Sequence, residues 1–445
     1  MPEIASPPAS TLTPAKTARQ RSDTFTSIWM IIAVAMALVT LVVKNRMPQP
    51  LWTMIHLVTL GVLSNGIFQW SWFFARSLAR LSADDPRARR HNTIRILIFN
   101  ACFLLLFVSM WLGWMVGTMI AATGIAAVAA WHGAEMLSVL RERLASRFVI
   151  VVRYYVCSAS FFVLAALLAS FVSATMFSPS IPEAMVAMRD RLTLAHALSG
   201  VAGWVGLTIG GTVITLGPTI LRTRMSPDAV SGGVRVLLPW CLSLLLAIAG
   251  ALLGVMPLVG AGILAVGTCA IVGIVYPYAK VLRNKGPREY SAWSFLLGLL
   301  WISVGVCALG VASLFVSTPS QLRALTLMWL PIIGIAGFAQ LFQGALSYLM
   351  PVVIGGGPSV VRIGIAIIDW QYSLRLGLRN SALILELFLF FTSDSPSVHV
   401  LRMAGWFLVI ATFVIDVVIY AKTGVTQARA RRARSETLSE SRQVQ

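Results

Sequence analysis

Two histidines stand at the start of long apolar, glycine-rich stretches of the sequence. His56 precedes residues 57–80 and His196 precedes residues 197–224, and both stretches end in basic residues. A neutral imidazole is a common ligand of copper and of haem iron, and an ionisable group within a membrane helix marks a candidate functional site. If these stretches belong to an internal repeat, the two histidines lie at similar depth and can face one cavity, where they can share a metal or a haem. The alternative is that both rings lie at the membrane surface, hydrogen-bonded to carbonyl groups or water.

Methionines form a second, weaker metal-binding candidate. Met185 and Met188 are spaced i, i+3, with Met176 and His196 near them in sequence. Thioether sulfur suits Cu(I). The chain has 17 methionines, so ordinary loop and interface methionines are the favoured interpretation of this group.

Three ionisable residues in apolar stretches are candidates for proton transfer. His132 and Glu135 are i, i+3 neighbours on one face of an expected helix. They can pass protons, or they can form a satisfied polar pair at the membrane surface. Glu386 lies in the middle of the apolar run SALILELFLFF. A carboxylate there costs a few kcal/mol unless it is protonated or paired, so it is a candidate either for a proton relay or for a bond between helices.

Amides also lie inside expected membrane helices. Gln340 and Gln343 fall in the middle of residues 324–350, and Asn65 and Gln69 form an i, i+4 pair in residues 50–74. Amide side chains hydrogen-bond well across helices. We therefore favour a structural role for these residues over ligand binding.

The composition is that of a membrane protein with several spans. Hydrophobic residues make up 58% of the 445 residues and charged residues 11%, and the mean hydropathy is +0.82. The formal charge of +19 is not a nucleic-acid footprint, because the basic residues gather in the loops of one side and at the termini. The positive-inside rule places that side, with both termini, in the cytoplasm of a plasma membrane protein, against the anionic leaflet. All but six of the 35 Lys and Arg fall there; the exceptions are Lys44, Arg46, Arg189, Arg191, Arg323 and Arg402.

The apolar runs predict an all-α integral membrane protein with about twelve transmembrane helices. Residues 1–24 are expected to be a disordered cytoplasmic tail, residues 25–422 the transmembrane domain, and residues 423–445 a basic, disordered cytoplasmic tail. Short connections at 113–115 and 254–257 predict helical hairpins, and 351–376 is expected to hold an interfacial helix. Glycine-rich spans recur every four helices, which indicates a weak threefold repeat. The predicted spans are 26–43, 50–74, 94–113, 115–138, 151–173, 195–220, 234–254, 257–279, 291–316, 324–350, 377–392 and 401–421.

Three stretches carry a family resemblance: HLVTLGVLSNGIFQWSWFFARSLAR (56–80), HALSGVAGWVGLTIGGTVITLGPTILRTR (196–224) and GFAQLFQGALSYLMPVVIGGGP (337–358). They resemble the membrane region of actinobacterial multicopper-oxidase and nitrite-reductase-type proteins, which is related to NnrS-type proteins and to subunit I of the haem–copper oxidases. The resemblance implies a pseudo-threefold bundle like that of oxidase subunit I. It also implies bound haem or copper, and a copper- or electron-transfer partner in the membrane or outside the cytoplasm.

The sequence departs from that family at the metal ligands. The family's span-six stretch reads His-x-His-x-Asn, whereas here Leu198 and Gly200 stand in place of the second His and the Asn. Residues 234–254 and 324–350 contain no histidine. The copper ligands of an oxidase and the second ligand of a low-spin haem are therefore missing, and this excludes an oxygen-reducing oxidase of the usual kind.

Two functions follow from these features. The first is a membrane redox or metal-handling protein that binds haem or copper and is linked to nitrogen-oxide or copper metabolism. The second is a cofactor-free transporter or scaffold with the same fold. No complete catalytic set is visible in the sequence, so enzymatic activity stays open.

Overall fold

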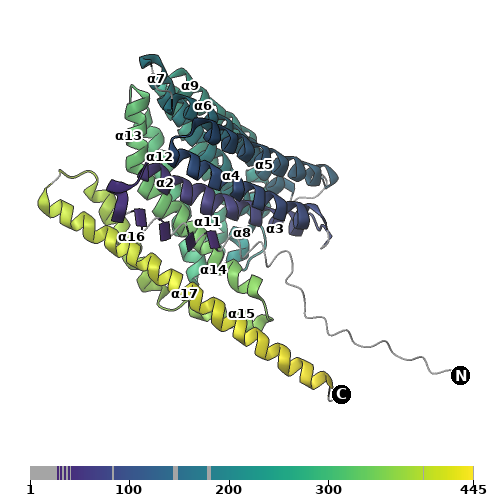
Figure 1. The fold of residues 1–445 in the computed structure, drawn as a ribbon. Coiled ribbons are helices and arrows are strands. Elements are labelled where there is room, and N and C mark those ends of the chain that lie inside the picture. The colour runs from purple at the N-terminus through teal and green to yellow at the C-terminus, as the bar shows by residue number, and fades with distance from the viewer. Residues whose placement is uncertain are drawn as a thin grey trace. The chain divides into compact units, whose positions relative to one another are not determined.

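The computed structural model describes residues 28–443 except 30, 33–34, 37–38, 41, 83–84, 144–148, 178–181 and 394. This part of the chain is α-helical and has no strand. The predicted tail 1–24 and much of the predicted span 26–43 lie outside the described residues. The chain divides into two compact units, Met1–Ile209 and Gly210–Gln445, and Figure 1 shows the helices of each.

Ten helical stretches of the described residues are long and apolar enough to cross a membrane. They run from Pro50–Leu78 at one end of the sequence to Pro396–Thr437 at the other. The chain is therefore a multi-pass α-helical membrane protein by length and composition. The expected number of about twelve spans and the pseudo-threefold arrangement stay predictions.

The first unit consists of helices that are partly α-helical and partly π-helical. α4 packs on α5, α5 on α6, and α6 on both α7 and η4. The wider π-helical turns are η2, η3 and η4, and such turns are frequent at functional sites. The elements are η1 (Lys44–Arg46), α2 (Pro50–His56), η2 (Leu57–Ser64), α3 (Asn65–Leu78), η3 (Arg87–His91), α4 (Asn92–Leu112), α5 (Met115–Glu142), α6 (Val149–Met176), α7 (Glu183–Ala197), η4 (Leu198–Gly206) and the start of α8 (Leu207–Ile220).

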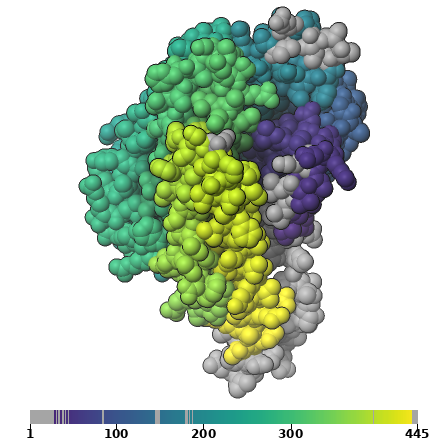
Figure 2. Space-filling view, turned by 90° about the vertical axis from the view of Figure 1, so that its left-hand side faces the viewer, coloured from purple at the N-terminus to yellow at the C-terminus, as the bar shows by residue number. Residues whose placement is uncertain are grey.

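In the second unit, α10 packs between α9 and α12, and α12 packs on α14. Close approach of α12 and α14 depends on Gly298 and Gly344, because a Cβ at either position would collide with backbone atoms of the other helix. α17 lies beside α15 and α16, and Figure 2 shows it on the surface of this unit. The elements are the rest of α8, α9 (Pro227–Leu253), α10 (Met256–Ala270), η5 (Ile271–Val275), α11 (Tyr276–Asn284), α12 (Tyr290–Ser313), α13 (Pro319–Pro331), η6 (Ile332–Ala339), α14 (Gln340–Ile354), α15 (Pro358–Ile368), α16 (Tyr372–Leu389) and α17 (Pro396–Gln443).

Both predicted hairpins are confirmed, and glycine explains each turn. α4 ends at Gly113 with φ 66° and α9 ends at Gly254 with φ 76°. Glycine adopts this left-handed conformation without the steric cost that other residues have. Each glycine is followed by a single residue before the next helix, so α4–α5 and α9–α10 are tight helical hairpins.

Three sequence-based expectations differ from the structure. Residues 423–443 are not disordered but continue α17, because helix-favouring Ala and Arg follow the span without a break. Met185 and Met188 lie in α7, although the sequence pattern placed them in a loop. The predicted span 377–392 belongs to α16, which starts earlier, at Tyr372. α16 is not among the ten candidate membrane spans, because it carries charged side chains.

Candidate functional site

His56 and His196 come together in the first unit. His56 is the last residue of α2 and His196 is the penultimate residue of α7, and a π-helical segment follows each of these helices. Their imidazole ring centres are 6.1 Å apart and the ring planes differ by 16°. The two rings therefore lie beside each other, while their common depth in a membrane stays a prediction.

The hydrogen bonds of the two histidines fix which ring nitrogen is available. Nδ1 of His56 lies 2.9 Å from the carbonyl oxygen of Trp52, and Nδ1 of His196 lies 2.8 Å from that of Ala165. A carbonyl oxygen only accepts hydrogen bonds, so each neutral imidazole carries its proton on Nδ1. Nε2 of each ring then keeps its lone pair. Metal-binding histidines in proteins have this same arrangement.

Aromatic side chains hold His56 in place. The indole of Trp52 stacks on the His56 ring with 4.3 Å between ring centres, and Phe107 packs against Trp52 at 5.9 Å. One turn of helix away, Trp111 donates a hydrogen bond of 3.0 Å to the hydroxyl of Thr53. These contacts tie the end of α2 to α4 and restrict the ring orientation of His56.

The pair is not part of a larger cluster of common ligands. Among the described residues, no group of three or more His, Cys, Asp or Glu side chains converges. Met185 and Met188 are 42% and 44% exposed on α7. A metal bound by His56 and His196 would therefore have two protein nitrogens and open coordination positions.

His132 and Glu135 face different partners, although both lie on α5. His132 is fully buried, its Nε2 is 3.2 Å from the hydroxyl of Ser71, and Phe68 packs edge-on against its ring. Glu135 accepts hydrogen bonds from the Arg95 guanidinium and from Nδ1 of His91, the latter over 2.7 Å. The structure therefore gives each of the two residues a separate polar cluster. The sequence pattern placed Arg95 in a solvated, charged loop at 76–95, but this residue is fully buried in α4.

The amides of the second unit take part in hydrogen bonds between helices. Gln340 and Asn380 exchange two hydrogen bonds, of 3.2 and 3.0 Å, between α14 and α16. Oε1 of Gln343 accepts a hydrogen bond from Arg379 and lies 3.2 Å from the Tyr290 hydroxyl. The structural role expected for these glutamines is consistent with both contacts. In the first unit, Asn65 and Asn100 form a comparable pair.

Glu386 is buried beside α17. Its side chain is 6% exposed and its Oε1 has no hydrogen-bond partner among the described residues. Gly405 lies against this oxygen, so a larger residue there would collide with it. Arg402 and Trp406 are the polar residues that interact with the carboxyl group.

A buried ionic cluster in the second unit was missed by sequence analysis. Arg375 and Arg379 of α16 both donate to the carboxylate of Asp416 on α17, and Tyr290 donates to the same carboxylate over 2.6 Å. The isolated acid in FVIDVVIY and the i, i+4 arginines are the signals that would have found it.

Comparison with known proteins adds no relative. No family model, no curated protein and no solved structure matches the chain. The fold defines the chain as a multi-pass α-helical integral membrane protein.

Proposed function

We propose that this membrane protein handles a metal, and that His56 and His196 bind one copper ion or one haem iron. The observation that carries the proposal is the pair of nearly parallel imidazoles, 6.1 Å apart, each with Nδ1 at a backbone carbonyl. A metal lies about 2 Å from an imidazole nitrogen, so two rings with centres 6.1 Å apart can share one ion when their Nε2 atoms face each other. Imidazole suits both copper and iron.

The side chains around the pair have defined roles in this proposal. His56 and His196 hold the metal through Nε2, while the carbonyls of Trp52 and Ala165 fix the tautomer and the ring orientation. The stacked indole of Trp52 shields one face of His56 from water. The bound metal would supply electron-transfer or ligand-exchange chemistry at its open positions.

The wider setting of the proposal comes from the family resemblance of residues 56–80, 196–224 and 337–358. It supports a link to nitrogen-oxide or copper metabolism and a copper- or electron-transfer partner. The charge asymmetry of the loops supports a plasma membrane location with both termini in the cytoplasm.

The test is a reduced-minus-oxidised spectrum of the protein purified in mild detergent, together with iron and copper analysis. We expect either a Soret band with stoichiometric iron or stoichiometric copper without haem. His56→Ala and His196→Ala should each abolish retention, because one imidazole alone leaves the metal weakly bound. His399→Ala, which removes an exposed imidazole at the start of α17, should retain the metal. Full retention of the metal in both His56→Ala and His196→Ala would contradict the assignment of these histidines as its ligands.

A cofactor-free transporter or scaffold is the second candidate. The observation in its favour is the buried cluster of Arg375, Arg379 and Asp416, since ionisable residues inside membrane helices often mark transport pathways. A purified protein without colour or metal, with His56 and His196 intact, would put this function ahead of the metal-handling one.

A further inference from the structure

A basic cavity of about 210 Å³ lies in the second unit, where three helices end. It is formed by the end of α8, by the segment between α11 and α12, and by the first turn of α12. Its charged lining comprises Arg222, Lys285, Arg288 and Glu289. With three cations and one carboxylate, the lining carries a net positive charge.

Contacts within the protein neutralise only part of this positive charge. The Arg222 guanidinium donates a hydrogen bond of 2.5 Å to the Glu289 carboxylate. Lys285 donates to the backbone carbonyl of Arg222 over 3.2 Å, which leaves its charge without an acidic partner there. Arg288 is exposed and makes no hydrogen bond or ion pair within the described part of the chain. Two cations of the cavity are thus available to an anion.

The backbone at the cavity is held in an unusual conformation. Arg222 has φ 53°, in the left-handed region that non-glycine residues rarely adopt. The hydrogen bond from Lys285 to the backbone carbonyl of Arg222 stabilises this turn. Such strain persists only where the surrounding structure fixes it, and it occurs often at ligand sites.

The cavity lies at the ends of three candidate membrane spans, where lipid headgroups are expected. The stretches Ala187–Ile220, Met256–Asn284 and Tyr290–Ser313 are long and apolar enough to span a membrane, and the cavity is at the ends of all three. Basic pockets between the ends of membrane helices bind the phosphate-bearing headgroups of anionic lipids.

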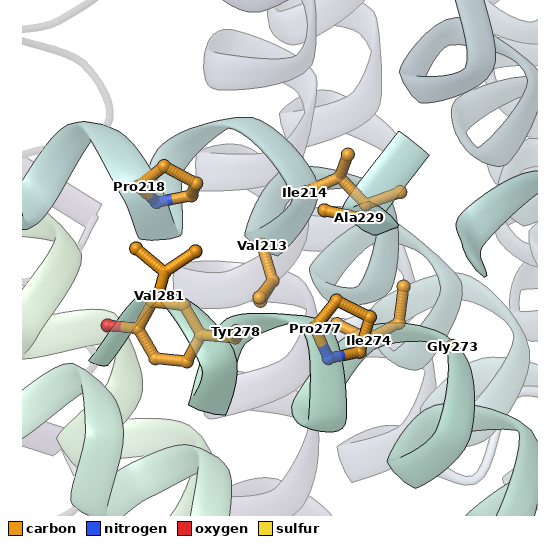
Figure 3. Close-up of a pocket in the computed structure, with 9 residues that line it drawn as sticks. All are labelled: Val213, Ile214, Pro218, Ala229, Gly273, Ile274, Pro277, Tyr278 and Val281. Carbon is orange, nitrogen blue, oxygen red and sulfur yellow. The ribbon is translucent and has the colours of Figure 1, made fainter. Parts of the chain in front are cut away.

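A neighbouring crevice limits how such a lipid can bind. Figure 3 shows Val213 and Pro218 of α8 facing Tyr278 and Val281 of α11 across this apolar crevice. Its volume of about 10 Å³ holds one water molecule at most. An acyl chain does not fit there, so the chains of a bound lipid remain outside in the bilayer.

We propose that this cavity binds the phosphate group of an anionic phospholipid through Lys285 and Arg288, with Arg222 positioned by Glu289. The shared chemistry is a phosphate oxyanion, which a lipid or free phosphate can present. The lipid is favoured because the site lies at the ends of membrane spans. The proposal does not depend on metal binding at His56 and His196.

The experiment measures thermal stabilisation of the purified full-length protein in detergent. The probes are short-chain phosphatidylglycerol, short-chain phosphatidylcholine and inorganic phosphate. Arg288→Gln tests the site, because this side chain has no internal contact to lose. Arg283→Gln is the matched control, since this exposed cation of α11 does not line the cavity.

We expect phosphatidylglycerol to raise the melting temperature of the wild type, and Arg288→Gln to weaken its apparent affinity about fivefold, as expected for the loss of one basic residue at an anionic headgroup. Arg283→Gln should bind as the wild type does. The proposed site would be wrong if phosphatidylcholine raised the melting temperature as much as phosphatidylglycerol does. It would also be wrong if Arg288→Gln and Arg283→Gln weakened the affinity for phosphatidylglycerol equally. An equal, Arg288-dependent effect of inorganic phosphate would overturn the lipid as the source of the anion.

Discussion

Asp416 illustrates how single residues stabilise the interior of the second unit. Its fully buried carboxylate accepts hydrogen bonds from Arg375 and Arg379, whose side chains are 4% and 0% exposed. Arg379 also donates to the Thr412 hydroxyl over 3.1 Å. Charges removed from water are tolerated only when they are paired and hydrogen-bonded, and this cluster meets both conditions.

Asp416→Asn should therefore destabilise the protein strongly. The amide keeps the shape of the side chain but leaves two buried guanidinium groups without a counter-charge, at a cost of about 3–5 kcal/mol. Thr412→Val is the control, because it removes the two hydrogen bonds of this hydroxyl, from Arg379 and to the Val409 carbonyl, but leaves the counter-charge in place, and it should cost about 1–3 kcal/mol. Thermal unfolding in detergent measures both. If Asp416→Asn unfolds no earlier than Thr412→Val, the carboxylate does not have this role.

At the scale of elements, η4 positions His196 through its packing on α6. A Cβ placed on Gly203 would lie 2.5 Å from Cβ of Phe161, an atom fixed to the α6 backbone. A Cβ on Gly200 would lie 3.8 Å from Cβ of Ala165, an ordinary contact. Of these two glycines, only Gly203 is thus required for the close approach of η4 and α6.

Gly203→Ala should separate η4 from α6, since overpacking costs about 1–3 kcal/mol. Because Nδ1 of His196 is bonded to the Ala165 carbonyl of α6, metal retention should fall together with the melting temperature. Gly200→Ala should be neutral or slightly stabilising, because alanine favours the helix by up to about 1 kcal/mol. Equal behaviour of the two variants would contradict this account of the packing.

At the scale of the whole molecule, the distribution of charge predicts the orientation in the membrane. The basic end of α17 carries Arg429, Arg431, Arg432 and Arg434. Two of these hold the turn after α14: Arg431 donates to the Ile354 carbonyl and Arg434 to the Gly356 carbonyl, over 2.9 and 3.1 Å. The helical tail is therefore part of the folded second unit.

A fluorescent protein fused after Gln445 should fluoresce in the cytoplasm, because the positive-inside rule keeps this basic end inside. An enzyme reporter that is active only outside the cytoplasm should stay silent at the same position. When each reporter is inserted instead in the connection after Gly254, the fluorescent protein should stay dark and the enzyme reporter should be active. An active external reporter after Gln445 would reverse the predicted orientation.

The sequence alone determined the class of this protein, because apolar runs long enough to cross a membrane are a local property of the chain. It also determined both hairpins, since Gly113 and Gly254 supply the backbone conformation that ends a helix. The sequence placed His56 and His196 at one cavity only if the repeat is real, and the structure brings the two rings to 6.1 Å from each other.

Only the tertiary structure decided which polar side chains meet. His132 and Glu135 are neighbours along α5, yet helix packing directs them to Ser71 and to Arg95. Asp416 meets arginines about forty positions earlier in the chain. Hydrophobic periodicity reports which residues face inward, but it carries no information on which distant helix supplies the partner. That choice depends on how the helices pack.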